Sequence, residues 1–346
     1  MSKSTIAMFV ALGAGGGAAI TAAAYSLRAS PESKKPEPPV AAPAAPVARP
    51  NNTALAIPPH QAFSSVPAVA GSAVNPAGLF EYGFPGPVAD VANRSALVSS
   101  YDRRTRNPHW VAEHITPESL AQRHGDRKHS VFLEDESVPP KFRGLLKDYF
   151  RSGYDRGHQV PAADAKWSQK SMDETFYLTN MCPQVGEGFN RDYWAHFEDF
   201  CRRLTSRYPS VRIVTGPLYL PRKDPADNKT YVKYEVIGNP PSIAVPTHFF
   251  KVIFAEDGRA GGNVAIGAFV LPNAPIPNSK PITDFEMPLE ALERATGLEF
   301  ASKLPAARKR RLCADTTCAL VIQDFADKQK AFGKGDRRAI APPSSP

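Results

Sequence analysis

Short apolar runs, some of them alternating with polar positions, recur between residues 96 and 271. Such runs are typical of strands in a sheet that is buried on at least one face. The pattern predicts strands at residues 96–101, 109–115, 211–215, 231–237, 247–254 and 264–271. A polar turn at 102–108 separates the first two strands. The charged span 116–149 shows no clear period, and its pattern predicts no element.

A helical period appears in residues 189–204, where it predicts a helix with two different faces. Its apolar residues recur at threes and fours, at Tyr193, Phe197, Phe200 and Leu204. A second stripe has a spacing of four and consists of Asn190, Trp194, Glu198 and Arg202. Asn190 is a suitable first residue, and a short second helix is predicted at 288–297, from a proline to a glycine. Together these elements predict an α+β domain with a central, mainly antiparallel sheet flanked by helices.

The first 74 residues differ from the rest in composition. Residues 6–25 are apolar or small and carry no charge, and a run of about 20 such residues can span a bilayer. A cleaved secretory signal competes with this interpretation, and the basic, acid-free start also suits mitochondrial targeting. We predict that residues 1–28 form a mitochondrial targeting segment that also anchors the chain in a membrane. Residues 29–74 are rich in proline and alanine, which predicts a disordered tether. The folded domain then extends over 75–330, and a flexible tail over 331–346.

Charge and cysteine content narrow the function only slightly. The net charge of +8 and the pI near 9.3 suit a polyanionic partner such as nucleic acid or an anionic membrane. The four cysteines include no CxxC pair, which argues against a structural zinc site. Cys313 and Cys318 could close a small loop in an oxidising compartment, but the sequence favours reduced, partly buried thiols. Cys182 is expected to serve packing.

Two further groups of charged or titratable residues have ordinary interpretations. The basic run at 308–311 suits a nuclear address, a nucleic-acid patch or a solvated surface helix, and these alternatives stay open. Several histidines lie in apolar, strand-like or helix-like stretches and are expected to be structural: His109, His114, His196 and His248.

The stretch with the densest chemistry is Asp155, Arg156, Gly157 and His158. A neutral imidazole accepts a proton near neutral pH, and an arginine beside it can hold a phosphate. The glycine between them permits unusual backbone angles or the close approach of another group. Taken alone, these four residues would more often be a surface turn than a site.

The predicted helix supplies groups that would complete a phosphodiester-hydrolysing site. Mg²⁺ favours oxygen ligands and keeps several waters, so one amide oxygen at Asn190, with Glu198 binding metal-bound water, would suffice. Arg202 would add a cation on the same helix. Spacing alone still favours an amphipathic helix whose polar face is merely solvated.

Longer motifs make the chemical interpretation specific. They are Asp-Arg-Gly-His at 155–158, Leu-Thr-Asn-Met-Cys-Pro-Gln at 178–184 and Asn-Arg-Asp-Tyr-Trp at 190–194, with shorter pieces at 101–106, 167–170, 215–218 and 245–252. Over residues 75–300 the chain thereby resembles the DNA/RNA non-specific endonuclease family, most closely its mitochondrial endonuclease G branch. The resemblance implies a ββα-metal nuclease fold, in which two strands and a helix surround one divalent ion.

The resemblance also implies a role for each candidate residue. His158 resembles the general base, Asn190 the direct Mg²⁺ ligand, and Glu198 the carboxylate that acts on the metal through water. Arg156 and Arg202 resemble phosphate contacts. Asp155 is expected to orient the loop and Asn180 to be a supporting polar residue whose role stays open.

The implied activity is hydrolysis of DNA and RNA with a single Mg²⁺, or with Mn²⁺, which leaves 5′-phosphate ends. The family branch further implies a homodimer at the mitochondrial inner membrane, facing the intermembrane space, with relocation to the nucleus during cell death. Two alternatives remain. A membrane-tethered nucleic-acid-binding module without catalysis would have changes at His158 or Asn190, and neither is seen. A secreted nuclease would lose its first 25 residues and join Cys313 to Cys318.

Overall fold

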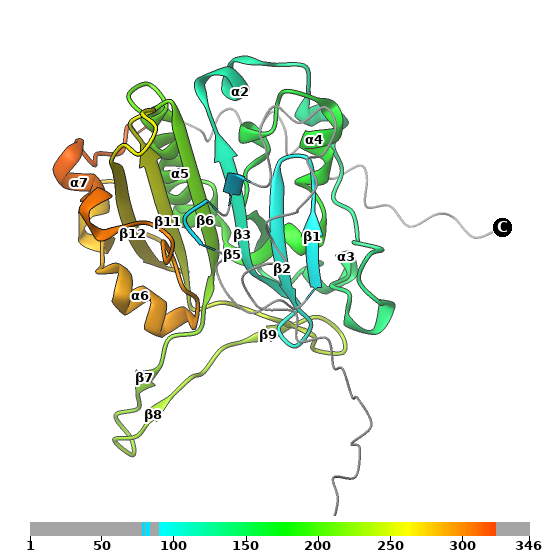
Figure 1. Ribbon diagram of the computed structural model, residues 1–346. Coiled ribbons are helices and arrows are strands. Elements are labelled where there is room, and N and C mark those ends of the chain that lie inside the picture. The colour runs from blue at the N-terminus through cyan, green and yellow to red at the C-terminus, as the bar shows by residue number, and fades with distance from the viewer. Residues whose placement is uncertain (1–77, 80, 84–89, 323–346) are drawn as a thin grey trace, which may run out of the picture. The chain divides into compact units, whose positions relative to one another are not determined.

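The computed structural model describes residues 78–79, 81–83 and 90–322 (Figure 1). The predicted targeting segment, the tether and the tail lie outside these residues and stay predictions. Within the described part of the chain, none of the helices has the length and apolar character needed to cross a bilayer.

Seven strands form the central sheet, in the order β1, β2, β3, β6, β11, β12, β13. Their bounds are β1 (Asp90–Asn93), β2 (Leu97–Asp102), β3 (Asn107–Ile115), β6 (Ser210–Leu218), β11 (His248–Glu256), β12 (Val264–Pro272) and β13 (Lys309–Arg311). Neighbouring strands are antiparallel except for the parallel pair β12–β13. The predicted α+β fold with a mainly antiparallel sheet is therefore confirmed, and all the predicted strands except 231–237 fall in this sheet.

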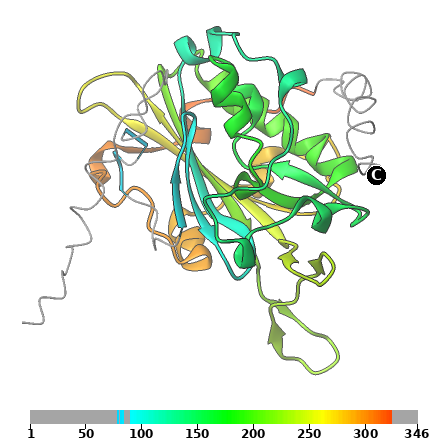
Figure 2. The same cartoon turned by 90° about the vertical axis from the view of Figure 1, so that its right-hand side faces the viewer.

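Both faces of the sheet are covered, which explains why its central strands are largely apolar. On β11, Phe249 and Ile253 belong to the core beneath α5 (Tyr193–Leu204). The intervening residues Phe250 and Val252 belong to a second core, together with residues of α6 (Leu289–Thr296). Because successive side chains of a strand point to opposite faces, α5 and α6 cover opposite sides of the sheet (Figures 1 and 2). The helix predicted at 288–297 is thus confirmed as α6, with Gly297 in the left-handed conformation just after it, at φ +70°.

A separate two-stranded sheet and α5 form a ββα unit. Strand β4 (Tyr154–His158) pairs antiparallel with β5 (Met181–Val185), and a turn over Gly186–Asn190 leads into α5. The prediction that Asn190 begins the helix is wrong, because α5 begins at Tyr193. Gly188 has a φ of +76°, which breaks the helical path, and its N–H donates to Asp192 Oδ2 at 2.6 Å. Asn190 is therefore held in the turn ahead of the helix.

The remaining α-helices and strands of the described residues are short. They are α2 (Pro117–Ala121), α3 (Leu146–Tyr149), α4 (Gln169–Glu174), α7 (Leu312–Asp315), β7 (Arg222–Lys223), β8 (Thr230–Tyr231), β9 (Val236–Ile237) and β10 (Ile243–Ala244). The predicted strand at 231–237 is wrong in its middle, since β8 pairs with β7 while β9 pairs with β10. Residues 232–235 between them are exposed, so their strand-like composition does not reflect burial in a sheet.

The basic run at 308–311 is not a surface helix. Lys309–Arg311 is the edge strand β13, parallel to β12. Arg308 donates to the carbonyl oxygen of Gly262 at 2.6 Å, and Arg311 forms an ion pair with Glu286. Two of these basic side chains are therefore used to hold the end of the domain to the sheet.

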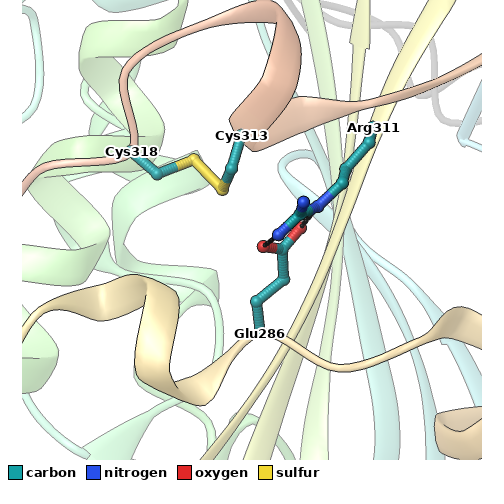
Figure 3. The surroundings of a disulfide bond; sticks show 4 residues. All are labelled: Glu286, Arg311, Cys313 and Cys318. Carbon is teal, nitrogen blue, oxygen red and sulfur yellow. Dashed lines mark hydrogen bonds and ion pairs between the residues drawn. A yellow bond between two sulfur atoms is a disulfide. The ribbon is translucent and has the colours of Figure 1, made fainter.

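Cys313 and Cys318 form a disulfide, so the expectation of reduced thiols is wrong for this pair (Figure 3). Helix α7 and the turn after it bring the two Cα atoms to 5.2 Å, within the range that a disulfide requires. Both cysteines and Leu320 pack against the core beneath α5. Cys182 and Cys201 are free thiols and are buried.

A half-buried histidine on β3 predicts acid sensitivity of the fold. His114 Nε2 lies 2.7 Å from Ser210 Oγ, and burial, helped by the charge of Arg212, lowers the pKa of His114 to about 3. Since a histidine in the unfolded chain titrates near 6.5, the unfolded state binds a proton that the folded state rejects. The free energy of unfolding should therefore fall by about 2 kcal/mol between pH 6.5 and pH 5 on account of this residue.

Urea unfolding at pH 7 and pH 5 measures this loss. In His114→Gln the stability difference between the two pH values should shrink, whereas in the control His129→Gln, at an exposed position, it should match the parent. An unchanged difference in His114→Gln would contradict the assignment.

Candidate active site

His158 is the last residue of β4 and lies opposite Met181 of β5. Its Nε2 is buried and has no hydrogen-bond partner among the described residues. The neighbouring Gly157 packs against Gln184, and a Cβ at position 157 would lie 1.9 Å from Gln184 Oε1. The glycine therefore leaves room for the Gln184 side chain, and this is the close approach of another group that the sequence suggested.

Two phenylalanine rings enclose the imidazole of His158. The ring of Phe176 meets it edge to face, with centroids 4.8 Å apart at 84°, and the centroid of Phe132 lies 5.7 Å away. Each phenylalanine also carries a guanidinium: Arg127 lies 4.9 Å over Phe176, and Arg156 lies 4.2 Å over Phe132. One aromatic pair thus holds the candidate base together with two cations.

This environment fixes the charge of His158. Burial lowers the pKa of His158 well below its ordinary value, and the charges of Arg127 and Arg156 lower it further. The imidazole is therefore neutral near pH 7 and able to accept a proton.

Asp155 joins β4 to the turn that holds Asn190. Asp155 Oδ2 accepts a hydrogen bond from Asn190 Nδ2 at 2.8 Å and another from Arg191 Nε at 2.7 Å. The amide nitrogen of Asn190 is thereby committed to a carboxylate on the strand that ends at His158.

The donor set around Asn190 suits a hard cation held mainly by water. With its nitrogen bound to Asp155, Asn190 has its amide oxygen left as the group that can bind a metal. No group of three or more His, Cys, Asp or Glu side chains in the described ranges is arranged to hold a metal. A cation that accepts one protein oxygen and several waters fits this arrangement, and Mg²⁺ has that preference.

Glu198 and Arg202 lie further along α5. Burial raises the pKa of Glu198 to about 7, against the opposing charges of Lys251, Arg202 and Arg127. Arg202 donates to Asp164 Oδ1 at 2.9 Å, so its guanidinium is already engaged by a carboxylate. Of the predicted site residues, Asp155 and Asn190 are in direct contact. Arg202 is paired with Asp164, and the phosphate-binding role of Arg202 stays a prediction.

Asn180 supports the segment that follows His158. Its Oδ1 accepts from the N–H of Val160 at 3.1 Å, and its Nδ2 donates to the carbonyl oxygens of Val160 at 2.9 Å and Thr175 at 2.8 Å. The N–H of Gln159 donates to the carbonyl oxygen of Asn180 at 3.0 Å. These bonds use both the oxygen and the nitrogen of the side-chain amide. Asn180 therefore supports the backbone that follows His158, a role that the sequence left open.

Arg127, Phe132 and Phe176 were not among the residues that the sequence singled out. Arg127 and Phe132 lie in the span 116–149, where the pattern predicted no element. Phe176 follows α4 and has the appearance of an ordinary core aromatic residue. Only the tertiary fold brings these side chains around His158, and no spacing in the sequence indicates that they cluster there.

Comparisons with known proteins identify the family of the chain. A family model described as DNA/RNA non-specific endonuclease matches residues 75–307. The chain is 63% identical over 273 residues to a Saccharomyces cerevisiae protein named mitochondrial nuclease, which covers 78% of this chain and 83% of that protein. It is 45% identical over 252 residues to mitochondrial endonuclease G of Bos taurus, with coverage of 72% and 82%. Among solved structures, a chain of the EndoG/EndoGI complex has a TM-score of 0.64 at 48% identity, covering 68% of this chain and 96% of that one.

The aromatic enclosure of His158 leads to a prediction on its titration. In Phe132→Ala, water gains access to the imidazole, so the pKa of His158 should rise toward 6.5. Phe132→Leu keeps an apolar cover and should leave the pKa close to that of the parent. NMR titration of the His158 ring, assigned by comparison with His158→Gln, measures the difference. Equal pKa values in all three proteins would show that the phenylalanine does not exclude water.

Proposed function

The chain belongs to the DNA/RNA non-specific endonuclease family, and we propose that it hydrolyses phosphodiester bonds of both nucleic acids at the site around His158. It is a mitochondrial nuclease, as are the relatives with 63% and 45% identity by their names. One observation supports the proposed chemistry above all others. The hydrogen bond of 2.8 Å from Asn190 to Asp155 fixes the proposed metal ligand against the strand that ends at the proposed base.

His158 accepts a proton from the water that attacks phosphorus. Its imidazole is neutral because burial and two cations lower its pKa, and its Nε2 has no other partner in the described structure. A bound phosphate brings negative charge that offsets Arg127 and Arg156, which raises the pKa of His158 when substrate is present. The base thus becomes stronger at the stage where it is needed.

Arg156 and Arg127 bind the phosphate and stabilise the charge that develops on it. A guanidinium can donate two parallel hydrogen bonds to phosphate oxygens, and the ring beneath each arginine supports it through a cation–π contact. Contacts of this kind address the backbone and carry no base information. The substrates therefore include DNA and RNA with little sequence preference.

A divalent cation bound through the oxygen of Asn190 would neutralise charge on the phosphate and on the leaving 3′ oxygen. Asp155 keeps the side chain of Asn190 oriented through its hydrogen bond, and Glu198 would hold water around the ion. We propose Mg²⁺, with Mn²⁺ as a substitute, and products that carry 5′-phosphate ends.

Further proposals concern where and in what form the enzyme acts. A homodimer, attachment to the inner membrane through residues 1–28, exposure to the intermembrane space and relocation to the nucleus in cell death follow from the resemblance to the endonuclease G branch. They stay proposals. A binding module without catalysis is the alternative that the following experiment separates from a nuclease.

Cleavage of a supercoiled plasmid and of a structured RNA tests the proposed function. The parent should cut both with Mg²⁺ and neither with EDTA. His158→Ala should lower kcat by roughly 10²–10⁴-fold, as expected for loss of a general base. Asn190→Ala should also lose cleavage, because it removes the proposed metal ligand.

The matched control is Asn263→Ala, at an exposed position in the turn between β11 and β12, which should cut like the parent. Binding of an uncut DNA duplex in EDTA should be retained by all variants. Normal cleavage by His158→Ala would remove the base assignment, and binding without cleavage by the parent would favour the non-catalytic module.

A further inference from the structure

Three of the motifs behind the family resemblance contain a residue that the proposed chemistry does not use: Thr215, Trp194 and Lys251. In the structure these three side chains meet at one ammonium group. Lys251 Nζ donates to Thr215 Oγ1 at 2.8 Å and to the carbonyl oxygen of Gln159 at 3.4 Å. It also lies 4.8 Å over the ring of Trp194.

The position of Lys251 is unusual for a charge. Lys251 lies in the middle of β11 and is only 1% exposed. Its neighbours two residues away on either side, Phe249 and Ile253, belong to the apolar core beneath α5. Burying an ammonium group is costly unless specific partners compensate for lost water, so an apolar residue would serve packing better. A role beyond packing is therefore needed to explain a lysine here.

The partners of Lys251 belong to the two arms of the active site, which are the end of β4 with His158 and the start of α5 after Asn190. Gln159 is the residue directly after His158, and its N–H is held by Asn180. Trp194 lies in the first turn of α5, four residues after Asn190. Lys251 therefore contacts both arms from a third element, the central sheet beneath them.

Resting on the proposed nuclease activity, we propose that Lys251 is the positioning residue of the site. Its ammonium group fixes the end of β4 relative to the start of α5, and thereby fixes the base at His158 relative to the metal ligand at Asn190.

A second role for the same charge has to be separated from positioning. Burial raises the pKa of Glu113 and of Glu198, and the charge of Lys251 opposes that rise in both. Glu113 is 2% exposed, and neither of its carboxylate oxygens has a hydrogen-bond partner in the described ranges. It shares the α5 face with Lys251, because Val111 and Lys251 both lie opposite Thr215 and Glu113 is two residues from Val111. The alternative role of Lys251 is therefore to compensate a buried carboxyl group, without positioning the site.

The experiment compares the full-length parent with Lys251→Met, Glu113→Gln and the double variant. Lys251→Met keeps an unbranched side chain one atom shorter and removes its charge, and we expect kcat to fall at least about tenfold. KM for DNA should change by less than about twofold, because Arg127 and Arg156 are untouched. The amides of Gln159 and Val160 should exchange hydrogen faster, a readout that does not depend on cleavage.

The double variant distinguishes the two roles. Removing both groups should restore the thermal unfolding midpoint relative to Lys251→Met, since a buried carboxyl group that has lost its cation no longer remains. If Lys251 positions the site, kcat stays low in the double variant; recovery of kcat would overturn the proposal. Normal kcat in Lys251→Met would overturn it as well.

Two further measurements keep the test decisive. If Lys251→Met does not fold, Thr215→Val removes one acceptor of the ammonium group and should lower kcat with KM unchanged; an unchanged kcat would overturn the proposal. If the parent cuts nothing with Mg²⁺, the proposed function fails, whereas the amide exchange of Gln159 and Val160 still decides whether Lys251 holds this segment.

Discussion

The antiparallel pairing of β4 with β5 is the interaction on which the site depends. It is a small ladder outside the main sheet, and the glycine at position 157 leaves room for the Gln184 side chain of β5 to lie over β4. The pairing sets His158 at the end of one strand and directs the other into the turn that carries Asn190. Asp155 then connects strand and turn through its carboxylate. The chemistry therefore rests on backbone geometry first and on side-chain identity second.

Much of the fold could be predicted because its physical causes are local. The strands of the main sheet can be recognised in the sequence as apolar runs, because both faces of β11 and β12 are covered. Helix α6 carries a proline and a glycine at its ends, and these residues act within one turn. The pattern failed where a tertiary partner decides the outcome. Residues 309–311 become a strand because β12 offers an open edge, and nothing in a basic run signals that edge.

The candidate site likewise contains residues that local motifs predict and residues that only the tertiary fold brings together. His158, Arg156 and Asn190 lie in recognisable motifs, so the sequence alone could name them. The start of α5 was placed too early, because the stripe of fours continues through Asn190 while Gly188 breaks the backbone before it. The aromatic pair Phe132 and Phe176 was missed altogether. Its members are 44 residues apart in sequence and meet only after folding, with ring centroids 5.1 Å apart.

The two ends of the main sheet have a consequence for behaviour in solution. A broad sheet with apolar faces offers unpaired N–H and C=O groups at its outer strands, and such edges can recruit strands from other molecules. Here the outer strands are β1, of four residues, and β13, of three residues with the sequence Lys-Arg-Arg. A short strand gives little length for pairing, and the basic side chains of Lys309 and Arg310 repel a second copy of themselves. The basic run thus works against aggregation of the enzyme at the crowded concentrations found inside an organelle.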